Sequence, residues 1–232
     1  MSFNGFPSIG LDLMIENRLM DSQDFYEAHK AEIKKLMIEP MQQLCLDMSE
    51  EMLKIDPLFV TTPSKMISRV RRDNRYTKDK SLYRANMWMF YRRVRKQRQM
   101  IPAYYFEVGP ESWGYGCFGC YERGEMETAR KMMLDGDKLF LCAREAVEKS
   151  GAVLMGDLYK RPKYPDAPED LQIWLNRKNI GVSWDEYDNY DPIFDGSFYS
   201  QMMERFKQLQ PFYEFLCAAR ERTAAPRAEA LR

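Results

Sequence analysis

Residues 103–121 read AYYFEVGPESWGYGCFGCY, with two runs of aromatic and aliphatic residues on either side of a Gly-Pro-Glu turn. The first run alternates, so Tyr105 and Glu107 point to one face of a strand while their apolar neighbours point to the other. The second run holds three glycines, which weaken a strand unless another backbone, an aromatic ring or a ligand lies close against it. The pattern predicts a β-hairpin.

The chain around this hairpin divides into a sheet region and helical regions. β-branched, aromatic and basic residues begin at Lys65, so we expect the sheet over roughly residues 65–121. Before it, an Asp-Ser pair at residues 21–22 supplies N-cap chemistry for a helix that ends at Pro40, and this proline can open a second helix. Helical spacing returns later over residues 125–151 with a break at 135–137, over 168–179, and over 197–209, followed by a last turn near Cys217.

These elements predict an α+β fold in which a mainly antiparallel central sheet is covered by N-terminal and C-terminal helices. With 232 residues, 45% of them hydrophobic, the chain can bury a sizeable core. We expect a single domain over residues 1–222 and a frayed tail over residues 223–232.

The overall composition argues against several classes of protein. A formal net charge of zero and a pI of about 6.6 argue against a dedicated nucleic-acid binder, without excluding nucleic acid. Five scattered cysteines and the absence of a basic-then-apolar leader favour a reduced, cytoplasmic protein. No apolar run approaches the roughly 20 residues that span a bilayer, so no membrane partner is expected.

The charges are segregated along the chain. Residues 65–98 contain thirteen Lys or Arg and two Asp, a local charge of +11, so the remainder carries −11. Residues 165–195 hold eight carboxylates against two basic residues. These two regions could neutralise each other in the fold.

The basic region contains the ordered stretch RVRRDNRYTKDKSLYR at residues 69–84. Cations this close together repel one another unless anions, carboxylates or solvent separate them. A turn at residues 73–75 and a helix start at residues 77–80 would add unpaired backbone N–H groups, which also hold anions. We therefore predict a site for a phosphorylated or carboxylated small molecule.

The predicted site gives each side chain a role suited to its chemistry. Arginine offers bidentate geometry and lysine a point charge. The anion would be bound by Arg69, Arg72, Arg75, Lys78 and Lys80, which Asp73 and Asp79 would orient. Further hydrogen bonds would come from Tyr83, Tyr105 and Glu107, and the pocket would be closed by Lys160 and Arg161.

Two other interpretations of the basic stretch stay open. In one, the stretch and the basic residues 92–98 form a non-enzymatic module that engages nucleic acid or an acidic protein. In the other, Asp73, Asp79 and the acidic residues 166–195 make a structural salt-bridge network that binds no ligand. The residues leave open whether the protein is an enzyme and what its oligomeric state is.

The sequence argues against most metal and cofactor chemistry. His29 is the only histidine and lies on an apolar helix stripe, which favours a packed residue over a catalytic one. Cys117 and Cys120 have redox spacing but fall in a predicted strand, so we expect them to be structural. No phosphate-binding or dinucleotide-binding glycine pattern and no nucleophile elbow is present, and neither metal nor cofactor is expected.

Several motifs together resemble one protein family. They are FYEAHK at residues 25–30, Pro40, the stretch at 69–84, YYF at 104–106, GYG at 114–116, LYKRP at 158–162 and LNRK at 175–178. Their order and spacing resemble the conserved hypothetical proteins grouped as domain of unknown function 2461. The chain departs from the family pattern at MDSQ, residues 20–23, where an Asn-rich run and an Arg are usual, and at Leu82, where Pro is frequent. The resemblance implies a single α+β domain, largely bacterial and soluble, and it implies no particular activity.

Overall fold

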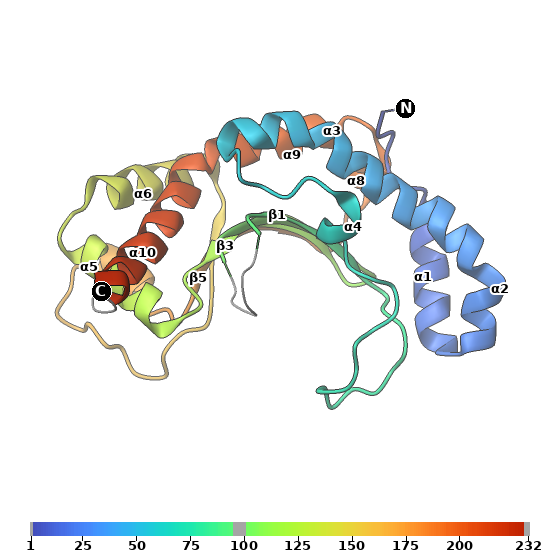
Figure 1. The fold of residues 1–232 in the computed structure, drawn as a ribbon, viewed down its shortest axis with the longest axis horizontal. Helices are drawn as coiled ribbons and strands as arrows, with labels where there is room; N and C mark the ends of the chain where they lie inside the picture. Colours follow the sequence, from blue (N-terminus) through green and yellow to red (C-terminus); the bar gives the residue numbers. More distant parts are fainter. Residues whose placement is uncertain (1, 95–100, 230–232) are drawn as a thin grey trace. The chain divides into compact units, whose positions relative to one another are not determined.

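The computed structural model describes residues 2–94 and 101–229, with side chains as far as residue 224. Over these residues, five strands form one antiparallel sheet in the order β1-β2-β3-β5-β4, accompanied by helices (Figure 1). The predicted α+β class is confirmed. The strands are β1 (Met87–Arg92), β2 (Ala103–Val108), β3 (Trp113–Gly119), β4 (Val153–Met155) and β5 (Ile180–Glu186).

The chain falls into two compact units. The first comprises the chain up to Tyr91 with residues 105–115 and 185–203, and the second comprises the other described residues. Strands β1, β2, β3 and β5 and helix α9 (Phe198–Gln208) contribute residues to both units. The single domain that we expected over residues 1–222 stays a prediction.

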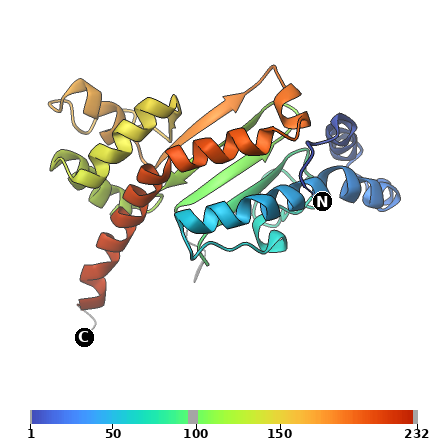
Figure 2. The same ribbon diagram turned by 90° about the horizontal axis from the view of Figure 1, so that it is seen from above.

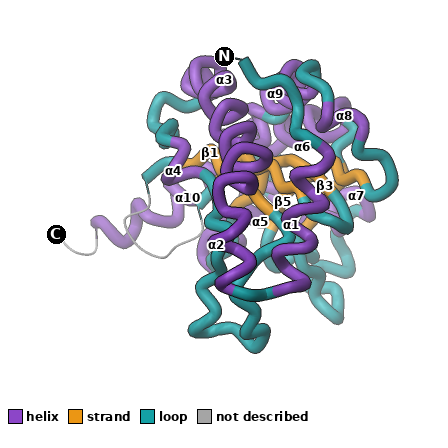
Figure 3. Tube along the Cα trace, turned by 90° about the vertical axis from the view of Figure 1, so that its right-hand side faces the viewer, coloured by secondary structure: helices purple, strands orange, loops and turns teal. Residues whose placement is uncertain are grey.

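The first unit begins with two helices that lie side by side, α1 (Ser8–Met20) and α2 (Gln23–Ile33) (Figure 3). The N-cap predicted at residues 21–22 is confirmed, because the Ser22 side chain accepts a hydrogen bond from the Phe25 N–H. Helix α1 was not predicted. Two short helices, α4 (Pro63–Met66) and α8 (Asp191–Phe194), also belong to this unit.

The prediction that the chain leaves the helical conformation at Pro40 is wrong, whereas the second helix that this proline was expected to open is present, with Pro40 in its first turn. Helix α2 continues through the π-helical segment η1 (Lys34–Ile38) directly into α3 (Glu39–Ile55). Proline lacks an N–H, and its ring clashes with the carbonyl four residues earlier in a regular helix. In the wider π turn the Glu39 N–H donates to the Lys34 carbonyl, so the helix accommodates Pro40 near the start of α3.

Helices α3 and α9 cover one face of the strands of this unit (Figure 2). The Tyr91 hydroxyl of β1 donates to the Cys45 carbonyl of α3. The Phe198 ring of α9 lies 5.3 Å from the Phe106 ring of β2, measured between centroids. Tyr105 and Glu107 are only half-buried, as expected if they point to the opposite face.

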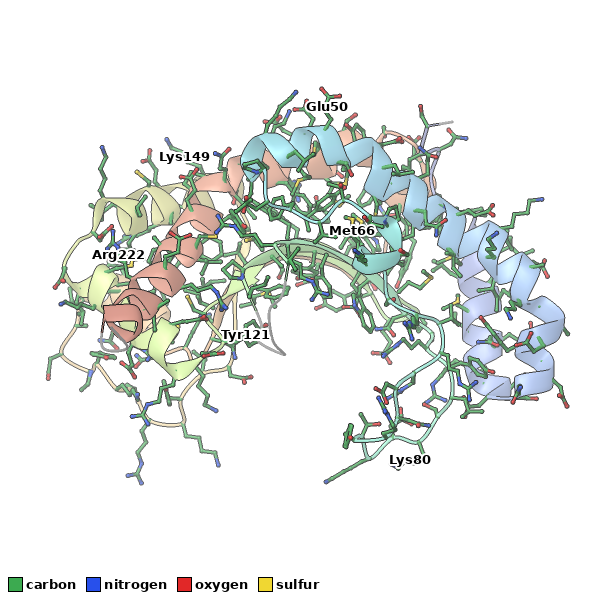
Figure 4. The ribbon with its side chains drawn as sticks, in the orientation of Figure 1. Glu50, Met66, Lys80, Tyr121, Lys149 and Arg222 are labelled. Atoms are coloured by element: carbon green, nitrogen blue, oxygen red, sulfur yellow. The ribbon has the colours of Figure 1, made fainter. Side chains whose placement is uncertain are left out.

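Residues 67–86 do not form the regular strand that we predicted. They meet their neighbours through two isolated bridges, Ile67 to Met89 and Arg71 to Tyr83, and otherwise form a long loop. Figure 4 shows Lys80 at the far end of this loop. No helix begins at residues 77–80, contrary to our expectation. The dense positive charge explains the difference, because unpaired cations are costly to bury inside a sheet.

In the second unit, α10 (Gln210–Glu229) packs against α5 (Arg123–Leu134) and α6 (Lys138–Ser150). The predicted break between two helices and the glycine after the second are confirmed, since Gly151 caps α6 with a φ of +69°. Helix α10 is a long helix where we expected only a last turn near Cys217, and its helical backbone continues through residues 223–229, which we expected to be a frayed tail. The predicted helix at residues 168–179 is present as α7 (Glu169–Leu175).

The sheet extends beyond the predicted limit of residue 121, because β4 and β5 pair antiparallel in this unit. On its other side β5 neighbours β3, and this neighbour explains one of the three glycines of β3. A Cβ atom on Gly116 would lie 2.0 Å from the Val182 carbonyl oxygen of β5, so only glycine fits there. The close backbone that we predicted beside these glycines is therefore confirmed for Gly116.

None of the helices in the described part of the chain combines the length and the apolar character needed to span a membrane.

Candidate anion-binding site

The long loop of residues 67–86 carries the basic stretch, and we call it the basic loop. A pocket of about 290 Å³ lies in the first unit, where this loop meets the β2–β3 hairpin. Three arginines and two glutamates line it together with smaller groups. The lining residues are Arg18, Arg72, Arg84, Ala85, Asn86, Glu107, Gly109, Pro110, Glu111 and Ser112.

The end of helix α1 holds the basic loop in place. Asp21 follows α1 in the left-handed conformation, with a φ of 43°, which aspartate tolerates better than most residues. Its Oδ1 accepts hydrogen bonds from the backbone N–H of Leu82 at 2.8 Å and of Tyr83 at 3.1 Å. Arg18, in the last turn of α1, thereby lies beside the same loop.

Asp79 joins the two arginines that come from these different segments. Its Oδ2 accepts a hydrogen bond from Arg72 Nη1 and lies 3.5 Å from Arg18 Nη2. Its Oδ1 accepts from the Ser81 N–H at 3.0 Å. The backbone and hydroxyl hydrogen bonds from Ser81, with the charges of Arg72 and Arg18, lower the pKa of Asp79 from 3.8 to about 2. The carboxylate is therefore ionised at neutral pH and fixes both guanidinium groups.

Arg84 is the cation of the pocket without a carboxylate partner. Its guanidinium carbon lies 4.5 Å from the centroid of the Trp88 ring, and its Nε is buried without a hydrogen bond. Within the described residues its side chain makes no ion pair. Burial, reinforced by the charge of Arg72 and opposed by that of Glu107, lowers the pKa of Arg84.

The hairpin supplies the acidic side of the pocket. Glu107 accepts a hydrogen bond from Asn86 Nδ2. The turn after it is closed by the Gly109 N–H, which donates to the Ser112 carbonyl at 2.9 Å. Glu111, in this turn, is exposed, and its side chain has no ion-pair or hydrogen-bond partner in the part of the chain that the structure covers. The pocket therefore contains both signs of charge.

A family model described as "Conserved hypothetical protein (DUF2461)" matches residues 11–215. The chain belongs to this family. Searches of curated proteins and of solved structures find no match to it. In this DUF2461 chain the matched residues include all of the pocket.

Only two of the predicted site residues, Arg72 and Glu107, line this pocket. A second, open hollow of about 360 Å³ lies nearby on the same loop. It is lined by Arg69, Arg71, Arg72, Asp73, Asn74 and Arg75. Here Asp73 pairs with Arg75 through two hydrogen bonds of 2.8 Å. This pair is the kind of contact that the salt-bridge interpretation of the sequence expected.

The remaining predicted residues lie elsewhere. Lys78 and Lys80 are exposed on the loop, and Lys80 Nζ donates to the Asn74 carbonyl at 3.0 Å. Tyr83 is buried, with its ring 4.7 Å from the Tyr26 ring between centroids, so it packs in the core. Tyr105 is half-buried on β2 and does not line the pocket. Lys160 and Arg161 are exposed in the second unit, and their closing role stays a prediction.

Five charged or polar residues of the pocket were not predicted from the sequence. These are Arg18, Arg84, Asn86, Glu111 and Ser112. Arg84 stands at the end of the basic stretch and could have been included on that ground. Arg18 carries no sequence signal that relates it to the loop, because tertiary contacts bring the two together, the hydrogen bonds of Asp21 and the ion pair of Arg18 with Asp79.

The other candidate groups are structural where they are described. His29 Nδ1 lies 2.9 Å from the Phe25 carbonyl oxygen and its ring stacks on Phe25. Cys117 and Cys120 are free and buried, and burial raises the pKa of both thiols. No cluster suited to a metal ion occurs among the described residues. Most of the basic tip predicted at residues 92–98 lies outside the described residues.

Proposed function

We propose that this protein binds a phosphorylated or carboxylated small molecule in the pocket between the basic loop and the β2–β3 hairpin. The observation that carries the proposal is Arg84, a half-buried arginine whose Nε is buried without a hydrogen-bond acceptor and whose side chain makes no ion pair within the described residues. A buried donor without an acceptor is costly, and such groups are concentrated at functional sites. An anion in the pocket would supply the missing acceptors.

Arg18 and Arg72 support the same proposal. Asp79 holds both of them, so little side-chain entropy is lost when they bind an anion. One carboxylate between two arginines also leaves a net positive charge. Arginine forms bidentate hydrogen bonds with phosphate and carboxylate groups, which suits these two classes of ligand.

The test is a thermal-shift screen with inorganic phosphate, sugar phosphates, dicarboxylates, nucleotides and short oligonucleotides. A ligand that binds only the native state raises the melting temperature. We expect at least one small anion to do so, and the Arg84→Met variant to bind it at least tenfold more weakly, roughly the contribution of one charged hydrogen bond. Without ligand, this variant should be more stable by about 1 kcal/mol, since an unsatisfied buried group is removed.

Arg71→Met provides the matched control, because Arg71 is an exposed arginine of the same segment that does not line the pocket. It should respond to small anions like the wild type. The pocket proposal fails if no small anion shifts the melt, or if Arg84→Met responds like the wild type.

Nucleic-acid binding is the second candidate, favoured by the exposed cations Arg69, Arg71 and Lys78, which have no ion pair within the described residues. It predicts that oligonucleotides, and not small anions, raise the melting temperature. In that case Arg71→Met would weaken the response and added salt would abolish it.

A further inference from the structure

The pocket holds cations and carboxylates that form no ion pairs with one another in the described part of the chain. Within the described residues, Glu107 and Glu111 make no ion pair with Arg18, Arg72 or Arg84, although all five line the same pocket. Opposite charges that face one space without touching could both be paired by a single ligand of complementary charge. We therefore consider the two carboxylates, together with the arginines, as groups that could contact the ligand.

Glu107 is fixed for this role. Asn86 donates to its Oε1, which orients the carboxylate and leaves Oε2 to accept from another group. A carboxylate accepts hydrogen bonds and cannot donate them, so it favours ammonium or hydroxyl groups and repels a second anion. Of these, only an ammonium also neutralises the charge, and a hydrogen bond between two charged groups is the stronger one.

The hairpin turn brings Glu111 into the same pocket lining as Glu107. The turn is closed by the hydrogen bond of Gly109 to Ser112 and is tied down by the Tyr190 hydroxyl, which donates to the Gly109 carbonyl at 2.8 Å. Two carboxylates in one pocket strengthen the preference for a cation.

We propose that the ligand is zwitterionic, with a phosphate or carboxylate bound by Arg84, Arg72 and Arg18 and an ammonium group bound by Glu107 and Glu111. This inference rests on the proposed function above and specifies its ligand class. The pocket volume of about 290 Å³ lies at the lower end of the range for ligand pockets, which favours a molecule of amino-acid or aminoalkyl-phosphate size over a nucleotide.

The experiment compares two probes of nearly equal shape, phosphoethanolamine and n-propyl phosphate, by isothermal titration calorimetry at pH 7. They differ only in that an ammonium replaces a methyl group. We expect phosphoethanolamine to bind the wild type about tenfold more tightly, the effect of one charge-assisted hydrogen bond. In Glu107→Gln the two affinities should come within about twofold of each other, while n-propyl phosphate binds at least as tightly as it does to the wild type, because a carboxylate that repels its phosphate is removed.

The outcomes separate this inference from the proposed function. If both probes bind the wild type equally, or n-propyl phosphate binds better, the zwitterionic ligand is ruled out while the anion site stands. If neither probe binds and no small anion of the thermal-shift screen does, dicarboxylates included, the anion site itself is ruled out and the inference with it.

Two further variants distinguish a loss of ligand contacts from a general disturbance of the fold. Glu111→Gln changes an exposed side chain and should reduce the advantage of phosphoethanolamine without altering the melting temperature. Arg84→Met should weaken both probes equally, because it removes a contact to their shared phosphate. A preference for phosphoethanolamine that persists in both glutamate variants would overturn the assignment.

Discussion

Two carboxylates, Asp21 and Asp79, give the basic loop its conformation in different ways. Asp21 binds backbone N–H groups and anchors the base of the loop to helix α1. Asp79 binds side chains and holds two guanidinium groups beside the pocket. The sequence predicted that Asp79 orients cations, and its contact with Arg72 has this form. It could not have predicted Asp21, whose partners lie about sixty residues further along the chain.

The low pKa of Asp79 can be tested directly. A carboxyl whose pKa is depressed in the folded state stabilises the fold above its unfolded pKa, and that contribution is lost as pH falls through the folded value. For Asp79 the window therefore lies between about 3.8 and about 2. We expect the NMR shift of the Ser81 amide, which donates to this carboxylate, to titrate with a midpoint near pH 2.

Ser81→Ala provides the control for this titration, because it removes the hydroxyl contribution and keeps the backbone one. Its midpoint should move upward. A wild-type midpoint near pH 4 would contradict the contacts of Asp79.

At the scale of whole elements, the sequence predicted most helices but missed α1 and most of α10, and it predicted the strands less well. Residues at intervals of three and four identified most helices, because this spacing follows from the helix itself. The three-residue strand β4 is too short to show an alternating pattern. The π turn η1 was missed because a proline within a helical pattern normally indicates an end.

Strand β3 provides the sharpest prediction at this scale. In Gly116→Ala the new methyl group would collide with the Val182 carbonyl, and backbone cannot move aside as a flexible side chain can. We expect a loss of about 2–4 kcal/mol in the free energy of unfolding, or failure to fold. Chemical denaturation monitored by circular dichroism would measure it.

Gly124→Ala in helix α5 is the matched control. There the new methyl group would meet only the Thr223 methyl group, at 3.1 Å. Alanine also favours a helix over glycine, so the change should stay within about 1 kcal/mol. Equal effects of the two substitutions would refute the close approach of β5 to Gly116.

For the molecule as a whole, the pocket shows where prediction from sequence stops. Composition and spacing found the basic stretch and the hairpin, each of which is local in sequence. The pocket requires Arg18, Arg72 and Glu107 to meet, and these come from a helix, a loop and a strand. Tyr83 was misplaced for the same reason, since its partner Tyr26 lies on a distant helix.

The reactivity of the five cysteines measures how well the interior of each unit is closed to solvent. Burial raises the pKa of Cys45 to about 12 and also raises that of Cys117 and Cys120, whereas Cys142 is exposed. Thiolates are the reactive form, so iodoacetamide should label Cys142 first in the native protein. Peptide mass spectrometry would show this, and denaturant should make all five cysteines reactive.

Cys142→Ser should remove the fast labelling and leave the rest unchanged. Native labelling of Cys117 or Cys120 as fast as that of Cys142 would show that the interior of the second unit opens readily.

The π turn η1 changes which residues face inward along the continuous helical segment formed by α2, η1 and α3. Its buried residues Ile33, Met37, Met41 and Cys45 recur at intervals of four, and in an uninterrupted α-helix this interval would rotate the stripe by about 40° at each step. The wider π turn η1 offsets this rotation, so the buried residues stay on one side of the helix. A helical wheel drawn through α2 and α3 as a single regular helix would therefore assign inward and outward positions incorrectly on one side of the junction, and sequence alignments across it must allow for one extra residue.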